Sequence, residues 1–125
     1  MNQTFLLNDF YEVIASQNEE NRITASIRLN ASHNVFNGHF EQMPVVPGVY
    51  QTQIIKELLQ QLLDVNLTLT HGDNIKFTSM IIPTQHPELS IEIAYKETES
   101  GYTAEARLFR EELTFTKFKG TFKLI

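Results

Sequence analysis

Hydrophobic and polar side chains follow two different spacings along this chain. Residues 22–31 alternate between the two kinds, which is typical of a strand with one buried face. Over residues 48–63 the apolar side chains instead recur at helical spacing and form one broad stripe. The stripe consists of Ile54, Ile55, Leu58, Leu59, Leu62 and Leu63. We therefore expect a helix that buries this stripe and carries Gln53, Glu57 and Gln60 on its opposite face.

Strand signals dominate the chain after this helix. Four β-rich runs cover residues 74–82, 88–97, 102–110 and 113–125. One helix cannot cover both faces of so much sheet, so we expect a single α+β domain over residues 1–125, with an antiparallel sheet wrapped around one long central helix. Such a sheet leaves an edge strand free. Pairing two of these edges across a two-fold axis would hide them.

Composition and charge exclude several classes of function. Hydrophobic residues make up 42% of the 125 residues and charged residues 20%, which is ordinary for a globular domain. The sequence has no cysteine, so a disulfide, a thiolate metal site and a cysteine nucleophile are excluded. Its net charge of −5 disfavours nucleic acid as a partner. No apolar run reaches the ~18 residues of a membrane span, and the N-terminus lacks the features of a signal peptide. We expect a cytoplasmic protein that does not associate with membranes.

The most distinctive segment lies directly before the expected helix. Residues 36–49 read FNGHFEQMPVVPGV, in which a Gly-His-Phe triplet and a two-residue spacer precede Met-Pro-Val-Val-Pro-Gly-Val. Pro47 suits the start of a helix, where its missing N–H costs nothing. The segment resembles the signature of the 3-hydroxyacyl-(acyl-carrier-protein) dehydratases, which have the hotdog fold. The likeness extends to FLLNDFYEV at residues 5–13 and to IKFTSMIIP at residues 75–83.

This resemblance implies a site that dehydrates an acyl thioester. The reaction needs a base for the proton next to the carbonyl, an acid for the departing hydroxyl and donors for the thioester oxygen. His39 would be the base, because a neutral histidine titrates near the working pH; the alternative is a histidine that only packs in a turn. Backbone N–H groups near Gly48 suit the thioester oxygen. The resemblance also implies substrate contacts from Phe40, Val49 and Tyr50, although plain packing is preferred for Tyr50. We expect no metal and no cofactor.

The helix departs from the family pattern where the acid should stand. The family has glutamate or aspartate at the position of Gln53, and it commonly has glutamine one turn later, at the position of Glu57. The acid and the amide have therefore exchanged places along one helical face. An amide can orient a hydroxyl or a water, but it cannot deliver a proton at neutral pH.

Three interpretations of this exchange remain open. The first is a working variant in which Gln53 positions the hydroxyl and Glu57 supplies a proton through water; the overall preference is a dehydratase-like acyl-thioester protein with weak or altered activity. The second is a non-catalytic acyl-binding or scaffolding partner of an active dehydratase. The third is a hotdog acyl thioesterase, because an amide can hold an attacking water. Glu57 can equally be an exposed carboxylate beside Lys56.

The expected partners also come from the resemblance. They are a thioester of acyl carrier protein or of coenzyme A and a second copy of the chain, with a higher oligomer or pairing with a homologue as alternatives. In a dimer the helix of one subunit would face His39 of the other. Thr78 and Ser79 stand where the family has the paired arginines that meet the acidic carrier. Basic residues nearer the C-terminus offer a different docking surface or simply a solvated face: Arg107, Arg110, Lys117, Lys119 and Lys123.

Three further histidines are weaker candidates. We expect His33 to face solvent, with a place in the same pocket as His39 as the alternative. His71 and His86 fall in expected loops and have no carboxylate partners at metal-ligand spacing, which disfavours a metal site.

Overall fold

The computed structural model of the chain describes residues 4–36 and 44–125. Its elements in chain order are β1 (Tyr11–Glu19), β2 (Arg22–Leu29), a short 3₁₀ helix (Asn34–Phe36), α1 (Gly48–Leu63), β3 (Leu67–Phe77), β4 (Glu88–Glu97), β5 (Gly101–Arg110) and β6 (Leu113–Leu124).

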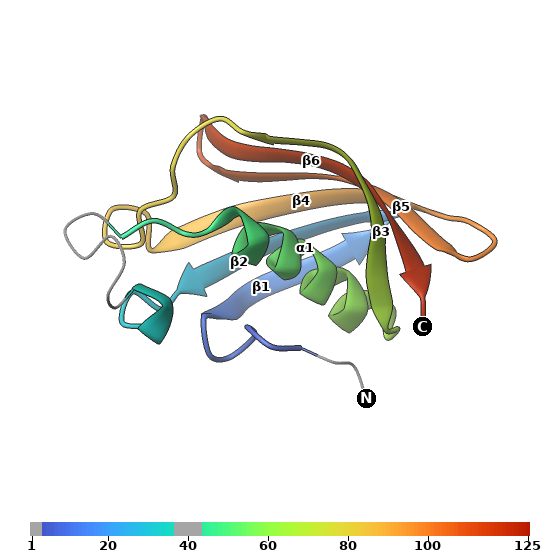
Figure 1. The fold of residues 1–125 in the computed structure, drawn as a ribbon, viewed down its shortest axis with the longest axis horizontal. Coiled ribbons are helices and arrows are strands. Elements are labelled where there is room, and N and C mark those ends of the chain that lie inside the picture. Colours follow the sequence, from blue (N-terminus) through green and yellow to red (C-terminus); the bar gives the residue numbers. More distant parts are fainter. Residues whose placement is uncertain (1–3, 37–43) are drawn as a thin grey trace.

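The strands form one antiparallel sheet in the order β1-β2-β4-β5-β6-β3. The sheet curves around α1, which lies along one of its faces (Figure 1). This arrangement confirms the expected α+β class with one long helix against an antiparallel sheet. The two edges of the sheet are β1 and β3. Within the described residues, no helix is long and apolar enough to cross a membrane.

The limits of α1 agree with the expected range of residues 48–63. Pro47 occupies the N-cap position with an extended backbone, so its fixed φ of −61° leads directly into the first turn. At the other end Asp64 adopts a left-handed conformation with φ 54°, and its N–H donates to the carbonyl of Gln60. Aspartate tolerates this conformation better than most residues, so the helix stops there.

The expectation for β3 is wrong at both ends. We expected a strand over residues 74–82, but β3 starts at Leu67 and ends at Phe77. His71 therefore lies in a strand rather than in a loop, whereas His86 does lie in the connection between β3 and β4. Most of β3 is exposed at the edge of the sheet, and its pairing with β6 is interrupted by two register shifts. An edge strand of this kind shows no alternation of apolar and polar residues.

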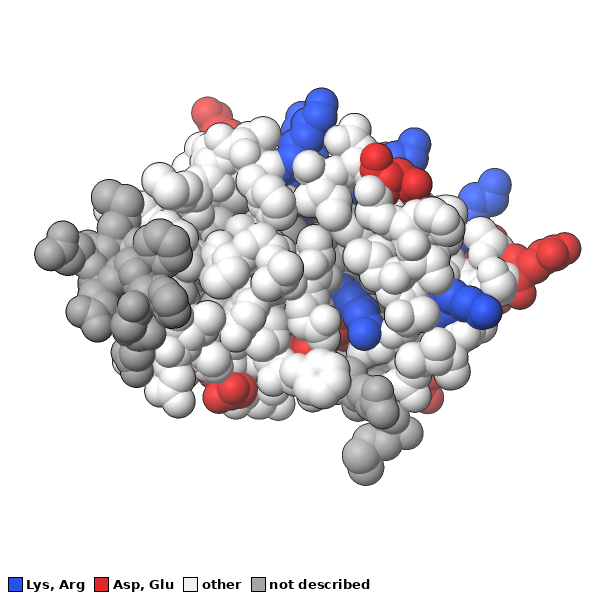
Figure 2. All heavy atoms as spheres, viewed as in Figure 1, with Lys and Arg blue, Asp and Glu red and all other residues white. Residues whose placement is uncertain are grey.

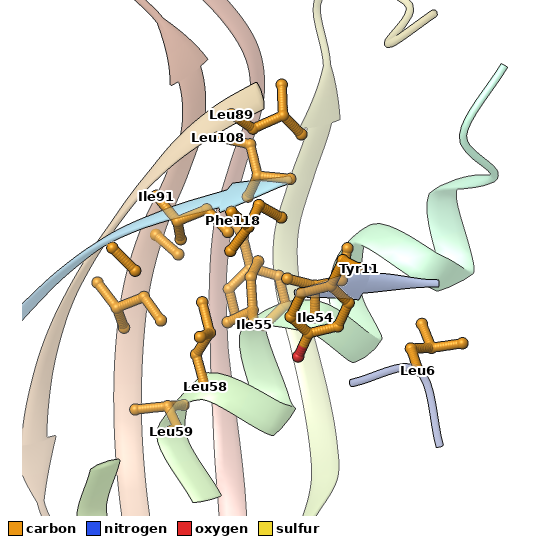
Figure 3. Close-up of a cluster of buried hydrophobic side chains, with 14 of the residues drawn as sticks. Leu6, Tyr11, Ile54, Ile55, Leu58, Leu59, Leu89, Ile91, Leu108 and Phe118 are labelled. Atoms are coloured by element: carbon orange, nitrogen blue, oxygen red, sulfur yellow. The ribbon is translucent and has the colours of Figure 1, made fainter. Parts of the chain in front are cut away.

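The core lies between α1 and the inner face of the sheet. Figure 3 shows Ile54, Ile55, Leu58 and Leu59 of the helix among sheet residues that include Ile91, Leu108 and Phe118. These four helix side chains are buried as expected, while Leu62 and Leu63 are only partly buried. The alternating residues of β2 are also buried as expected: Ile23, Ala25, Ile27 and Leu29.

The opposite face of α1 is not the polar surface that we expected. Glu57 and Gln60 are fully buried on this face, and Gln51 is buried on the apolar side of the helix, against Thr116 of β6. Each has polar partners; for example, Oε1 of Gln60 accepts the N–H of Leu67 at 2.9 Å. The N-terminal segment and the start of β3 cover this side of the helix, so a polar side chain stays there only because it is hydrogen-bonded.

Candidate active site

The N-terminus of α1 is packed closely against β3. A Cβ atom added to Gly48 would lie 2.7 Å from Cζ of Phe77, so the ring of Phe77 fills the space that the missing side chain leaves. Phe77 is nevertheless 53% exposed, and Val49, the residue after Gly48, is 73% exposed. The first N–H groups of a helix have no partner within the helix and suit a developing negative charge. Gly48 and Val49 stand at this helix end, and their predicted role beside a thioester oxygen stays a prediction; Phe77 is a neighbour that the sequence did not indicate.

Gln51 fixes the chain that leads into this helix. Its amide nitrogen donates to the carbonyl of Val46 at 3.2 Å, and its Oε1 accepts the hydroxyl hydrogen of Thr116 on β6. The N–H of Val46 in turn donates to the carbonyl of Ile81 at 2.9 Å. The segment before α1 is thus held between β6 and the segment that follows β3, although nothing in the sequence singled out Gln51.

An aromatic cluster surrounds the ring of Phe10. The ring of Phe10 lies 5.2 Å from the ring of His33, 5.7 Å from that of Phe36 and 4.9 Å from that of Tyr50, measured between centroids. Phe36 is three positions before His39 in the sequence. His39 and Phe40 themselves lie outside the described residues, so their predicted roles stay predictions.

The expectation that His33 faces solvent is wrong. Its side chain is only 13% exposed, and Nε2 lies 2.9 Å from Oδ2 of Asp9. Its Nδ1 accepts the N–H of Val35 at 3.0 Å. Because both ring nitrogens already have partners, His33 supports the aromatic cluster, and it lies edge-on to Tyr50 at 6.3 Å between centroids. Tyr50 thus packs as preferred, on the helix turn before Gln53.

Glu57 is the most highly coordinated side chain of the site. Its Oε2 accepts the N–H of Phe5 at 2.7 Å and of Leu6 at 3.0 Å. Its Oε1 accepts the N–H of Leu7 at 2.9 Å and the hydroxyl of Tyr11 at 3.0 Å. The alternative that Glu57 is an exposed carboxylate beside Lys56 is therefore wrong, because the residue is fully buried and holds the N-terminal segment against α1.

Gln53 completes this set of contacts. Its amide nitrogen donates to Oε2 of Glu57 at 2.9 Å, so the two side chains meet across one helical turn as their spacing predicted. All five partners of Glu57 are donors, so both of its oxygens serve as acceptors. Burial, and after it the negative charge of Glu57, raises the pKa of Tyr11, which keeps the phenol protonated as a donor.

Tyr11 and the backbone of residues 5–7 were missed by the sequence reasoning, although residues 5–13 carry part of the family likeness. The one available sign was Glu57 itself, since a glutamate on a helix side that is covered needs hydrogen-bond donors from elsewhere in the chain. Among the described residues, no group of three His, Asp or Glu side chains is placed to hold a metal ion. His71 contacts Thr70, and His86 packs edge-on to Phe115.

A curved antiparallel sheet with one long helix along its inner face is the hotdog fold, and solved structures share it. The dehydratase heterocomplex ApeI:P from Xenorhabdus doucetiae superposes with a TM-score of 0.72 at 21% identity, covering 89% of this chain and 96% of that one. Residues 15–115 match the ApeI-like family, described as ApeI dehydratase, and the chain belongs to this family.

Two further structures have the same fold at lower identity. An uncharacterised protein from Erwinia carotovora subsp. atroseptica gives a TM-score of 0.67 at 19% identity, with 90% of this chain and 93% of that one covered. A hypothetical thioesterase with coenzyme A from Streptococcus pneumoniae TIGR4 gives 0.64 at 10% identity, with 92% and 85% covered. A comparison with curated protein sequences finds no match.

Proposed function

We propose that the chain is a dehydratase-like protein that acts on 3-hydroxyacyl thioesters of acyl carrier protein, with weak or altered activity. Its family supports the reaction class. The observation that carries the proposal is the bond between Gln53 and Glu57, in which the acid and the amide of the dehydratase pattern have exchanged places but still contact each other.

The proposed reaction uses the loop and the helix N-terminus. His39 takes the proton from the carbon next to the thioester carbonyl, and the N–H groups of Gly48 and Val49 stabilise the charge on the thioester oxygen. The carbon–carbon double bond then forms as the carbon–oxygen bond of the 3-hydroxyl breaks. The hydroxyl needs a proton in order to leave as water, and Gln53 can orient this group but cannot protonate it.

Glu57 is poorly suited to replace the missing acid. Its two oxygens already accept hydrogen bonds from three backbone N–H groups, one phenol and one amide. Taking up a proton would turn one of these acceptor oxygens into a donor and oppose a bond that the fold uses. We therefore propose that Glu57 positions Gln53 and the N-terminal segment, and that proton delivery limits the rate.

The site would be completed in a homodimer. Phe77 at the end of edge strand β3 is half exposed. Met80, three positions later, is 61% exposed, and Val49, next to the Gly48 that Phe77 packs against, is 73% exposed. Pairing of β3 with β3 of a second copy would cover the free edge and part of this apolar surface. In that dimer, Gln53 of one subunit would face the loop histidine of the other.

Incubation with a 3-hydroxyacyl-carrier thioester tests the function, with enoyl product and free thiol followed together. We expect slow enoyl formation that His39→Ala abolishes. Gln53→Glu alone would bring two carboxyl groups to about the present 2.9 Å, so one of them would have to be protonated. The double variant Gln53→Glu/Glu57→Gln restores the family order without this repulsion.

The double variant is expected to raise enoyl formation by ~10²–10⁴, the usual contribution of a general acid. Its far-ultraviolet circular dichroism and melting temperature serve as controls for folding. Free thiol without enoyl product would instead identify a thioesterase. A folded double variant that binds the substrate and gives neither product would overturn the catalytic proposal.

A non-catalytic role beside an active homologue is the second candidate. Gln53 in place of the acid favours it, and the similar ApeI:P structure is itself a heterocomplex of dehydratases. In this case the chain should form a stable mixed dimer with a homologue that has glutamate at the Gln53 position. Size-exclusion chromatography of the two chains together tests this, and exclusive formation of separate homodimers would count against it.

A further inference from the structure

Three cations form a row across the outer face of the sheet. Lys76 on β3 is the register partner of Lys117 on β6, and Lys117 is the register partner of Arg107 on β5. Their sequence neighbours Ile75, Leu108 and Phe118 pack in or against the core, so these three side chains point away from α1. Lys76 and Lys117 are exposed, and Arg107 is half-buried. We call these three residues the cationic row.

The nearby carboxylates are engaged with other cations. Glu92 is the register partner of Arg107 but pairs with Arg22 at 2.8 Å, and Glu105 lies 3.8 Å from Lys119. Within the described part of the chain, no member of the cationic row forms an ion pair. Like charges placed opposite each other on neighbouring strands are destabilising. Glu92 and Glu105 offset this repulsion only in part, because each is paired with a cation outside the row.

The surface around the row is shaped and partly preorganised. The guanidinium of Arg107 lies 3.8 Å from the ring centroid of Phe109, which holds it in place without an acidic partner. The row borders a hollow of about 390 Å³ whose lining includes five cationic and two acidic side chains, a surplus of three positive charges. This surplus stands in a protein whose net charge is −5.

We propose that the cationic row is the docking surface for an acidic helix of the acyl carrier protein. Neighbouring strands are ~4.8 Å apart, and carboxylates three or four residues apart on a helix are separated by ~5–6 Å. An acidic helix lying across β5, β6 and β3 can therefore place successive carboxylates over successive cations. A long polyanion such as RNA is disfavoured because the rest of the chain repels it. Naming the carrier as the partner rests on the proposed function.

One end of the row is close to the candidate site. Lys76 directly precedes Phe77, whose ring packs against Gly48 at the start of α1. The helix side of the molecule, shown in Figure 2, carries few charged side chains over its centre. A carrier docked on the row would thus lie across the sheet from α1, with one end of the row a single residue along β3 from Phe77, and on a surface different from the Thr78–Ser79 position of the family arginines.

Titration calorimetry with a carrier protein that has its phosphopantetheine arm but no acyl group tests the proposal at 50 and 200 mM salt. We expect Lys76→Gln/Lys117→Gln to raise the Kd by about 2- to 30-fold at low salt and to reduce the salt dependence. The matched control is Lys96→Gln/Lys123→Gln. It removes the same charge from exposed strand positions at the other end of the sheet, and we expect it to leave the Kd within about twofold of wild type.

Turnover of a 3-hydroxyacyl pantetheine thioester, which has no carrier, separates this inference from the proposed function. The row variant should turn over this small substrate as wild type does. If the wild-type chain does not turn over the small substrate but the row variant binds the carrier more weakly than wild type, the catalytic function is rejected and the docking surface is kept. Absence of carrier binding, equal weakening by both double variants, or row-dependent binding of anionic vesicles instead of the carrier would overturn the docking proposal.

Discussion

The amide nitrogen of Gln53 lies 2.9 Å from Oε2 of Glu57, one helical turn away. The bond commits one N–H of Gln53 and leaves its second N–H and its carbonyl oxygen for other partners. Glu57 binds the N-terminal segment through three backbone N–H groups. Under the proposed function, the carboxylate that a dehydratase would use at position 53 stands at position 57, so the exchange changes both the chemistry of the site and what supports it.

Replacing Glu57 with glutamine should destabilise the fold. The substitution removes the charge and one acceptor oxygen from a buried group with five donors, so the free energy of unfolding should fall by about 1–3 kcal/mol. Urea denaturation measures this, with the exposed Glu112→Gln as the matched control. Unchanged stability combined with complete loss of turnover would contradict the positioning role and make Glu57 the acid.

Stability at high pH should depend on Tyr11. The folded chain raises the pKa of Tyr11 above its ordinary value of about 10, chiefly through burial. Below pH 10 the phenol is protonated in both the folded and the unfolded chain. Above pH 10 only the unfolded chain releases the proton, so the free energy of unfolding falls as the pH rises. Tyr11→Phe should remove a slope of about 1.4 kcal/mol per pH unit. Unfolding between pH 9 and 11 tests this against Tyr95→Phe, and equal slopes in both variants would contradict it.

Gly48→Ala should place its new methyl group against the ring of Phe77. The 2.7 Å approach requires the ring to move, but the ring is 53% exposed and can turn toward solvent, so the loss should be no more than ~1 kcal/mol, the lower end for overpacking. Phe77→Ala should rescue this loss, so a double-mutant cycle of melting temperatures should show coupling. Additive effects of the two substitutions would show that the ring is not the obstacle.

The wild-type chain should sediment as a dimer at micromolar concentration. Phe77→Glu should shift it toward monomer, because the substitution buries a charge beside the paired β3 edges. Phe5→Glu is the matched control, since Phe5 is 70% exposed but lies on the N-terminal segment. A wild-type monomer, or equal dissociation of both variants, would reject pairing through this edge.

Strong periodicity made most of the fold predictable. The apolar stripe and Pro47 defined α1, and alternation defined β2 and β4, because each of these elements buries one face against the core. β3 lacked this signal, since an exposed edge strand with register shifts has no consistent inner face. Pattern and burial are linked, so the elements least buried were the hardest to place.

The contact between Gln53 and Glu57 was predictable, but the other partners of Glu57 were not. The motif and the i to i+4 spacing brought Gln53 and Glu57 together correctly. The burial of Glu57 depends on backbone donors about fifty positions away in sequence, and backbone N–H groups have no residue-type signature. For the same reason, the enclosure of His33 by Phe10 and Asp9 could not be seen from spacing alone.

The attachment of the N-terminal segment to Glu57 also imposes an order on folding. Phe5, Leu6 and Leu7 are separated from their acceptor by 52, 51 and 50 positions. During synthesis from the N-terminus these backbone groups remain without their native partner until α1 has left the ribosome. Closing a loop of this length is entropically costly and slow compared with helix formation. This segment is made before α1 and is thus among the last to reach its final place.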